Sequence, residues 1–211
     1  MKLRLVLPVF SLAVAAMTLA VSPSAFAGPI TTIDFNCSDG SGTTTGNKSI
    51  CASPTTETLV SWTQGAFSVS PTNGTWFYNF FQGNPSPSLS ATGGGTVSIT
   101  DGGSWFRFDS VDLEAAGAGN TGYTFIGKLD GSTVFDFGCS GPTCLSTSFA
   151  TELAGLYGND NINSLTINLI GGGNDRVDNI DVTGVPEPSG LLLLGTGILA
   201  LAFFVRRKLV A

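Results

Sequence analysis

The chain has 211 residues, 28 glycines, no histidine, and fifteen acidic residues against nine basic ones. The lack of histidine excludes the Ser-His-Asp triad, the Cys-His pair and the His-ligated zinc hydrolases. Five of the cations lie near the two chain ends, so residues 28–188 carry four cations against fifteen acids, a net charge of −11. Such a charge repels phosphate backbones, and we expect no nucleic-acid partner.

The first 27 residues have the features of a signal peptide. Lys2 and Arg4 precede a long apolar run, and the small-x-small sequence Ala25-Phe26-Ala27 follows it. This order predicts export with cleavage after Ala27. The alternative is a first membrane helix, which Pro8 and the cleavage-type sequence disfavour. We therefore expect residues 28–184 to form one exported domain.

Short aromatic and β-branched segments separated by Gly, Ser, Thr and Asn fill this middle region, which predicts an all-β sandwich or jelly roll. The predicted strands are 31–35, 59–69, 75–81, 96–100, 105–113, 123–129, 132–137, 164–170 and 177–182. One segment, 148–157, has apolar residues at helical spacing and is the single helical candidate.

The alternation of apolar residues changes phase within residues 105–113. Phe106 and Phe108 share one phase, whereas Val111 and Leu113 share the other. A β-bulge at Asp109-Ser110 would turn all four side chains to the core.

Four cysteines in an exported chain indicate two disulfides. Three pairings are open, and we favour the local one, Cys37 with Cys51 and Cys139 with Cys144, because Ser, Gly, Thr and Asn fill the short loops between them. A structural zinc site is disfavoured, since the chain lacks histidine and neither spacing has the two-residue gap of a zinc knuckle.

Residues 105–113, 164–169 and 177–182, with an aromatic strand between the first two, resemble extracellular modules of the galactose-binding-like jelly-roll type. The resemblance covers about the second half of the domain. It implies a fold and does not by itself imply a function.

The C-terminal segment combines Val185-Pro186-Glu187-Pro188, an uncharged run from Gly190 to Val205, and Arg206-Arg207-Lys208. The sixteen uncharged residues span about 24 Å as a helix, against roughly 30 Å for a bilayer core, so with Ser189 we predict a short transmembrane helix over 189–205. The three cations stay cytoplasmic by the positive-inside rule, which places the domain outside.

This order of parts, over residues 185–211, resembles the PEP-CTERM sorting signal. The resemblance implies an exosortase-type membrane protease as partner, removal of the tail after a transient stage in the inner membrane, and delivery to the cell surface or an exopolysaccharide-rich matrix. The alternative is a plain anchor behind a stiff proline linker.

A glycosidase would need two carboxylates, and Asp109, Asp112 and Glu114 form the closest cluster of acids. We favour a solvated sheet edge for this cluster, so no catalytic residue is predicted and the protein is not expected to be an enzyme.

Two Gly-Asn-Asp pieces, 158–162 and 173–177, resemble half of a calcium-binding nonapeptide repeat. Their spacing is fifteen residues instead of nine, and we favour turn positions for Asp160 and Asp175. No cofactor is expected, with calcium at these two residues as the alternative.

Residues 75–81 place Trp76 and Tyr78 on one face of a strand. If that face is exposed, Trp76, Tyr78 and Trp105 would offer aromatic surfaces to sugar rings. The favoured alternative is that both faces are buried.

The sequence therefore predicts a non-enzymatic surface or matrix protein associated with extracellular polysaccharide. A carbohydrate-binding module is the second hypothesis, and a hydrolase using Asp112 and Glu114 is the third.

Overall fold

The computed structural model describes residues 28–46, 49–52, 58–85, 87–116, 122–141, 144–171, 173–185, 195–199, 202 and 206. The predicted signal peptide and most of the predicted transmembrane helix lie outside these residues. Residues 195–199 are helical. Among the residues described, no helix combines the length and the apolar character needed to cross a bilayer.

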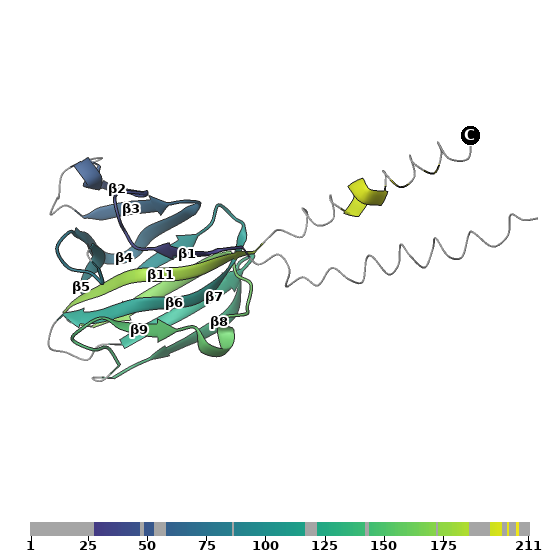
Figure 1. Cartoon of the computed structure of the whole chain (residues 1–211). Helices are drawn as coiled ribbons and strands as arrows, with labels where there is room; N and C mark the ends of the chain where they lie inside the picture. Colours follow the sequence, from purple (N-terminus) through teal and green to yellow (C-terminus); the bar gives the residue numbers. More distant parts are fainter. Residues whose placement is uncertain are drawn as a thin grey trace, which may run out of the picture.

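Antiparallel strands build the domain, with short 3₁₀ turns between some of them (Figure 1). The strands are β1 (Ile30–Ile33), β2 (Gly40–Thr44), β3 (Leu59–Gln64), β4 (Phe67–Asn79), β5 (Ser88–Thr100), β6 (Trp105–Ala116), β7 (Gly122–Leu129), β8 (Ser132–Cys139), β9 (Ala150–Leu153), β10 (Ser164–Ile170) and β11 (Asn174–Val185). The 3₁₀ turns are η2 (Ile50–Ala52) and η3 (Gly155–Tyr157).

The strands form two layers that share β4 and β5. One layer runs β2-β3-β4-β5-β10-β7-β8, and the other joins β1, β11, β6 and β9 to the first half of β5. Between the halves of β5, Gly93 and Gly94 have φ values of 76° and 83°, and Gly74 of β4 has a φ of 81°. A Cβ on Gly94 would lie 2.6 Å from the Leu169 carbonyl oxygen. Glycine at these places lets the β4–β5 hairpin bend from one layer into the other.

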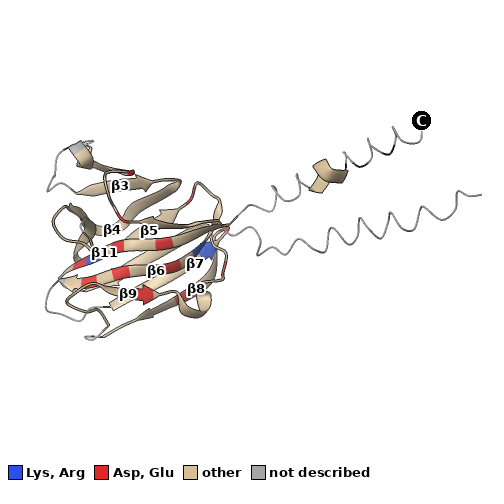
Figure 2. Ribbon diagram, viewed as in Figure 1, with Lys and Arg blue, Asp and Glu red and all other residues tan. Residues whose placement is uncertain are grey.

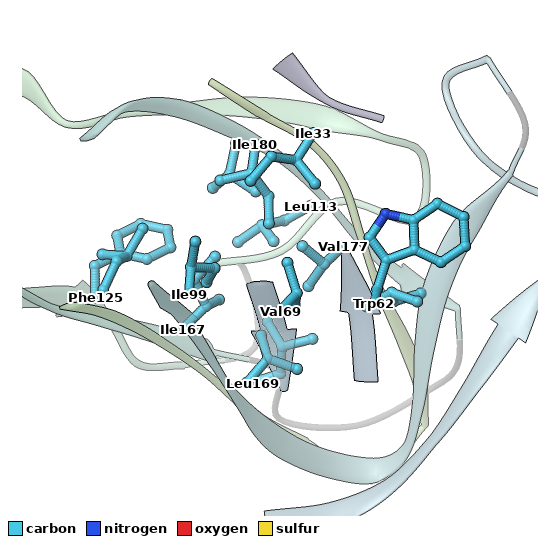
Figure 3. Packing of buried hydrophobic residues seen from close by; sticks show 14 of the residues in the cluster. Ile33, Trp62, Val69, Ile99, Leu113, Phe125, Ile167, Leu169, Val177 and Ile180 are labelled. Carbon is cyan, nitrogen blue, oxygen red and sulfur yellow. The ribbon is translucent and has the colours of Figure 1, made fainter. Parts of the chain in front are cut away.

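The core lies between the layers. Phe108 of β6 contacts Phe125 of β7 with ring centroids 5.1 Å apart, and Phe67 of β4 contacts Phe106 of β6 at 5.5 Å. Because β6 is not hydrogen-bonded to β4 or β7, these contacts cross the space between two sheets, as in a β-sandwich. Figure 3 shows apolar side chains from both layers converging on this interior.

The predicted β-bulge is confirmed. Ser110 of β6 pairs with Asp181 of β11, and Phe108 pairs with Val182, so Asp109 has no register partner. The four apolar side chains at 106, 108, 111 and 113 are all fully buried. The bulge therefore turns both apolar pairs of β6 inward and leaves Ser110, Asp112 and Glu114 on the opposite face.

The other predicted elements show three differences. The helical candidate 148–157, which is short enough to be a single turn, forms only the 3₁₀ turn Gly155–Tyr157, because Ala150–Leu153 pairs with β6 as β9. The predicted strand 59–69 is two strands, β3 and β4, joined by a turn at Gly65 with a φ of 59°. Strand β2 and the first half of β5 were not predicted, since glycine, serine and threonine fill them.

The favoured disulfides are confirmed. Cys37 bonds to Cys51 and Cys139 to Cys144, with Cα atoms 5.5 and 5.6 Å apart. The first links the β1–β2 connection to η2, and the second closes a loop directly after β8.

The first and last strands lie side by side and end at the same pole of the domain (Figure 1). Ile30 pairs with Thr183, and the Gly28 backbone N–H donates to the Gly184 carbonyl at 2.8 Å. We call this end, defined by residues 28–30 and 183–185, the exit pole. It places the end of β11 next to the start of β1.

Candidate functional site

Acidic residues follow β6, β11 and β9 across one side of the sandwich (Figure 2). Val177 and Leu113 are register partners in the core, and the next pair along the two strands is Asp178 with Asp112. Since side chains alternate along a strand, both carboxylates point to the outer face. We call Asp112 and Asp178 the acid pair.

Each carboxylate of the acid pair is surrounded by donors. Oδ1 of Asp112 accepts from the Thr151 hydroxyl at 2.6 Å, and Oδ2 accepts from the side-chain amides of Asn179 at 2.8 Å and Asn84 at 3.2 Å. Asp178 accepts the backbone N–H of Asn84 at 2.5 Å and that of Asn179 at 2.9 Å. Like charges on opposed strand positions repel. These five donors offset part of that repulsion.

Asp178 has no exposed surface. Burial raises its pKa to about 7, and the charges of Asp112 and Asp34 also raise it, although the two backbone N–H groups lower it. The folded domain therefore holds a proton at this site at mildly acidic pH, where the carboxyl of an unfolded chain is ionised.

The acid pair holds the connection between β4 and β5, residues 80–87, which we call the β4–β5 loop. Asn84 contacts both carboxylates, and the Asn179 side chain donates to the Asn84 carbonyl. Within the loop, the Ser88 hydroxyl donates to the Gln82 carbonyl, and the Asn79 amide donates to Gln82 Oε1 at 2.8 Å. The loop is thus attached to β6 and β11 through the hydrogen bonds of Asn84 with Asp112, Asp178 and Asn179.

Two phenylalanines at the start of this loop are exposed. Phe80 is 47% exposed and Phe81 is 80% exposed. Their ring centroids lie 5.2 Å apart in an edge-to-face arrangement, and Phe80 also contacts the Tyr78 ring at 6.4 Å. We call Phe80 and Phe81 the aromatic pair.

The predicted exposed platform is wrong for two of its three residues. Trp76 and Tyr78 are 0% and 6% exposed. The Trp76 indole donates to the Asn73 carbonyl at 2.9 Å, and Tyr78 stacks on Trp62 with centroids 5.4 Å apart. Both side chains fill the core, because β4 turns this phase inward, and burial raises the pKa of Tyr78 to about 12. The favoured alternative, burial, holds for these two residues.

Trp105 does not join them. It is half-buried and pairs with Val185 at the exit pole. The structure therefore does not bring the three predicted sugar-binding residues together.

The predicted solvated edge at Asp109, Asp112 and Glu114 is also wrong. Strand β6 pairs with β11 on one side and β9 on the other, so it is an inner strand. Asp109 accepts from the Thr183 hydroxyl at 2.6 Å, and Glu114 forms a half-buried salt bridge with Arg176 at 2.6 Å. Each of the three acids has its own partners and stabilises its own cross-strand contact.

The calcium candidates lie far apart. Asp160 is near the bridge between Phe106 and Ile162, whereas Asp175 pairs with Ala115. From 106 to 115 a strand extends about 30 Å, so one ion cannot contact both acids. Asp175 is not a turn residue, because it lies in β11 and is fully buried. Among the residues that the structure describes, neither of its carboxylate oxygens has a hydrogen-bond partner, and burial raises its pKa. In the described part of the chain no group of three or more metal-binding side chains is present.

Sequence reasoning missed Asn84, Thr151, Asp178 and Asn179, which come from three separate segments. A signal for one segment exists, because Asp178 and Asn179 stand together between Val177 and Ile180 and break the alternation of apolar and polar residues there. A polar pair inside a strand predicts either a bulge or a buried hydrogen-bond network.

The predicted processing motif begins where the sheet ends. Val185 is the last residue of β11, and Pro186, Glu187 and Pro188 follow it outside the described residues. In the basic cluster, Arg206 is described and is helical, whereas Arg207 and Lys208 are not described.

Comparisons with known proteins agree with the sorting signal predicted for the C-terminal segment. No curated protein sequence matches the chain. Among solved structures, the CBM22-1 xylan-binding domain of Paenibacillus barcinonensis Xyn10C is similar at 14% identity and a TM-score of 0.39, covering 77% of this chain and 98% of that one, which is too distant to indicate a ligand. The family model of the PEP-CTERM protein-sorting motif matches residues 184–208. The chain therefore carries a PEP-CTERM sorting motif: it is an exported, cell-surface-directed protein, and the motif implies processing by exosortase-type machinery.

Proposed function

We propose that this protein is a non-enzymatic component of the cell surface or extracellular matrix that associates with extracellular polysaccharide. The observation that carries the proposal is the joining of the sorting motif to the sheet itself: the matched residues begin at Gly184, inside β11. A domain joined in this way is presented by its exit pole.

The chemistry of the outer face of β6 and β11 supports a neutral glycan as partner. Carboxylates, hydroxyls and amides alternate along it, for example Thr32, Asp181 and Ser110, where the two hydroxyls donate to Asp181 at 2.5 and 2.8 Å. Groups of this kind exchange hydrogen bonds with sugar hydroxyls. The net charge of −11 for residues 28–188 disfavours phosphate-rich and other anionic partners, including nucleic acid.

A non-enzymatic role is supported by the engagement of the acids that a hydrolase would need. Asp112 lies beneath the β4–β5 loop with three donors, and Glu114 is paired with Arg176. A general acid must reach the glycosidic oxygen. Release of reducing ends from a polysaccharide by the wild-type domain, lost in Asp112→Asn, would favour the hydrolase instead.

The polysaccharide test is co-sedimentation of the purified domain, residues 28–188, with insoluble neutral polysaccharides and with crude matrix from a cell surface. We expect retention on at least one neutral glycan and none on an acidic uronan. No co-sedimentation with any neutral or acidic glycan would overturn the polysaccharide part of the proposal.

The proposed tail removal has its own test. Intact-mass measurement of the protein recovered from its native cell surface should find a C-terminus near Pro188, after a transient stage in the inner membrane. A mature protein that still contains Arg206-Arg207-Lys208 and ends at Ala211 would mean that the segment is a plain anchor.

A further inference from the structure

The aromatic pair is unusual for its exposure. Phenylalanine side chains are mostly buried in folded domains, and adjacent exposed rings mark an interaction surface more often than an isolated apolar residue does. Phe81 presents four-fifths of its surface to solvent, and Phe80 presents about half. In contrast, the aromatic residues 76 and 78 in the same alternating run are buried.

The rings are held in place and do not sit on a loosely attached tip. Phe80 contacts Tyr78, whose hydroxyl donates to the Phe35 carbonyl at 3.1 Å inside the core. On the other side of the pair, Gln82 accepts from Asn79 and Ser88, and Asn84 is bonded to the acid pair. A surface whose groups are fixed before binding loses less conformational entropy when the ligand arrives.

The surroundings of the rings indicate the chemistry of the partner. Gln82 is an exposed amide directly after Phe81, and Asn84 is an exposed residue of the same loop whose side-chain amide donates to Asp112, so the residues that follow the aromatic pair are neutral and polar. A pyranose ring combines an apolar face of C–H groups with hydroxyls at its edge. The C–H face can stack on a phenylalanine ring, and the hydroxyls can exchange hydrogen bonds with a neighbouring amide. The loop rests on the carboxyl groups of Asp112 and Asp178, and acidic groups disfavour uronic acids and anionic lipids as partners.

We infer that Phe80 and Phe81, with the amide of Gln82, form the contact surface for a neutral polysaccharide. This inference rests on the proposed function and names its site. The acid pair acts on binding through Asn84, as a positioning group under the loop.

The experiment compares the wild-type domain with the double variant Phe80→Ala, Phe81→Ala on the neutral polysaccharide that the wild type binds best. We expect binding at least tenfold weaker, corresponding to about 1.4 kcal/mol or more for two lost ring contacts. The matched control is Leu156→Ala, because Leu156 is 94% exposed on η3, away from the loop, and its loss should leave binding unchanged. Thermal unfolding of both variants should stay within a few degrees of the wild type.

A second variant tests the stacking itself. Phe81→Trp enlarges the exposed ring and should tighten binding about two- to fivefold, whereas Asn84→Ala keeps both rings but frees the loop and should weaken it.

The outcomes separate the two claims. If the wild type binds a glycan and the double variant binds within twofold of it, the site is wrong while the polysaccharide role stands. If the wild type binds no glycan but binds vesicles of neutral phosphatidylcholine, and the double variant loses that binding, the aromatic pair is a membrane contact and both claims fall.

Discussion

The inner and outer faces of β6 and β11 are stabilised by different kinds of interaction. On the inner face, Phe106, Phe108, Val111 and Leu113 are fully buried against the opposite layer. On the outer face, the same strands present carboxylates that accept hydrogen bonds from hydroxyls and amides. Apolar burial depends on area and shape, whereas the outer face depends on the protonation of its acids. The inner face should therefore determine how stable the domain is, and the outer face how that stability varies with conditions.

The largest expected effect is on the inner face. Phe108→Ala removes a ring that contacts Phe125 and leaves a cavity between the layers, so we expect the free energy of unfolding to fall by about 3–5 kcal/mol in urea denaturation. The matched control is Phe81→Ala, an exposed phenylalanine, with an expected change below about 0.5 kcal/mol. Equal losses for the two variants would mean that the layers are not packed as described.

A smaller loss is expected from the outer face. Asp112→Ala leaves the Thr151 hydroxyl and the amides of Asn84 and Asn179 without their acceptor, at a cost of about 2 kcal/mol. Asp136→Ala on β8, an exposed acid, is the control and should change stability by less than about 0.5 kcal/mol. A loss no larger than the control's would show that the acid pair does not hold the loop.

The last effect separates the two faces by their response to pH. Because burial raises the pKa of Asp178 to about 7, the folded protein keeps a proton that the unfolded chain releases near pH 4. This contribution is fully present below about pH 4 and is lost as pH rises through about 7, so the unfolding temperature should be lower at pH 8 than at pH 5. Burial also raises the pKa of Asp175 and of Asp101, which adds to the same trend.

The variant Asp178→Asn isolates the contribution of this one carboxyl group. It should reduce the difference in unfolding temperature between pH 5 and pH 8, whereas Phe108→Ala should lower both temperatures and leave the difference unchanged. A pH dependence identical in wild type and Asp178→Asn would assign the titration to other groups.

Much of the inner face could be predicted from sequence, and little of the outer face. The change of phase at Asp109-Ser110 predicted the bulge, because four apolar residues on two phases need one extra residue to share a side. The phase of Trp76 and Tyr78 could be read in the same way, but alternation alone does not tell which phase faces the core. Phe80 shares the phase of the buried Trp76 and Tyr78 but is exposed together with Phe81, because β4 ends at Asn79.

The outer site could not be predicted for a different reason. Its residues come from the β4–β5 loop, β6, β9 and β11, and they meet only when the bent hairpin crosses the second layer. Strand β2 and the first half of β5 were missed because their glycines and serines carry no periodic apolar signal, and their pairing depends on neighbours distant in sequence.

The adjacency of β1 and β11 at the exit pole has a mechanical consequence. A pull applied to the chain at Val185 acts along the axis of β11, which is hydrogen-bonded to β1 on one edge and β6 on the other. Hydrogen bonds in antiparallel sheets lie across the strand direction, so such a force shears them together and does not open them one after another. A load that reaches the domain through its C-terminal strand is thus shared by two neighbouring strands at once.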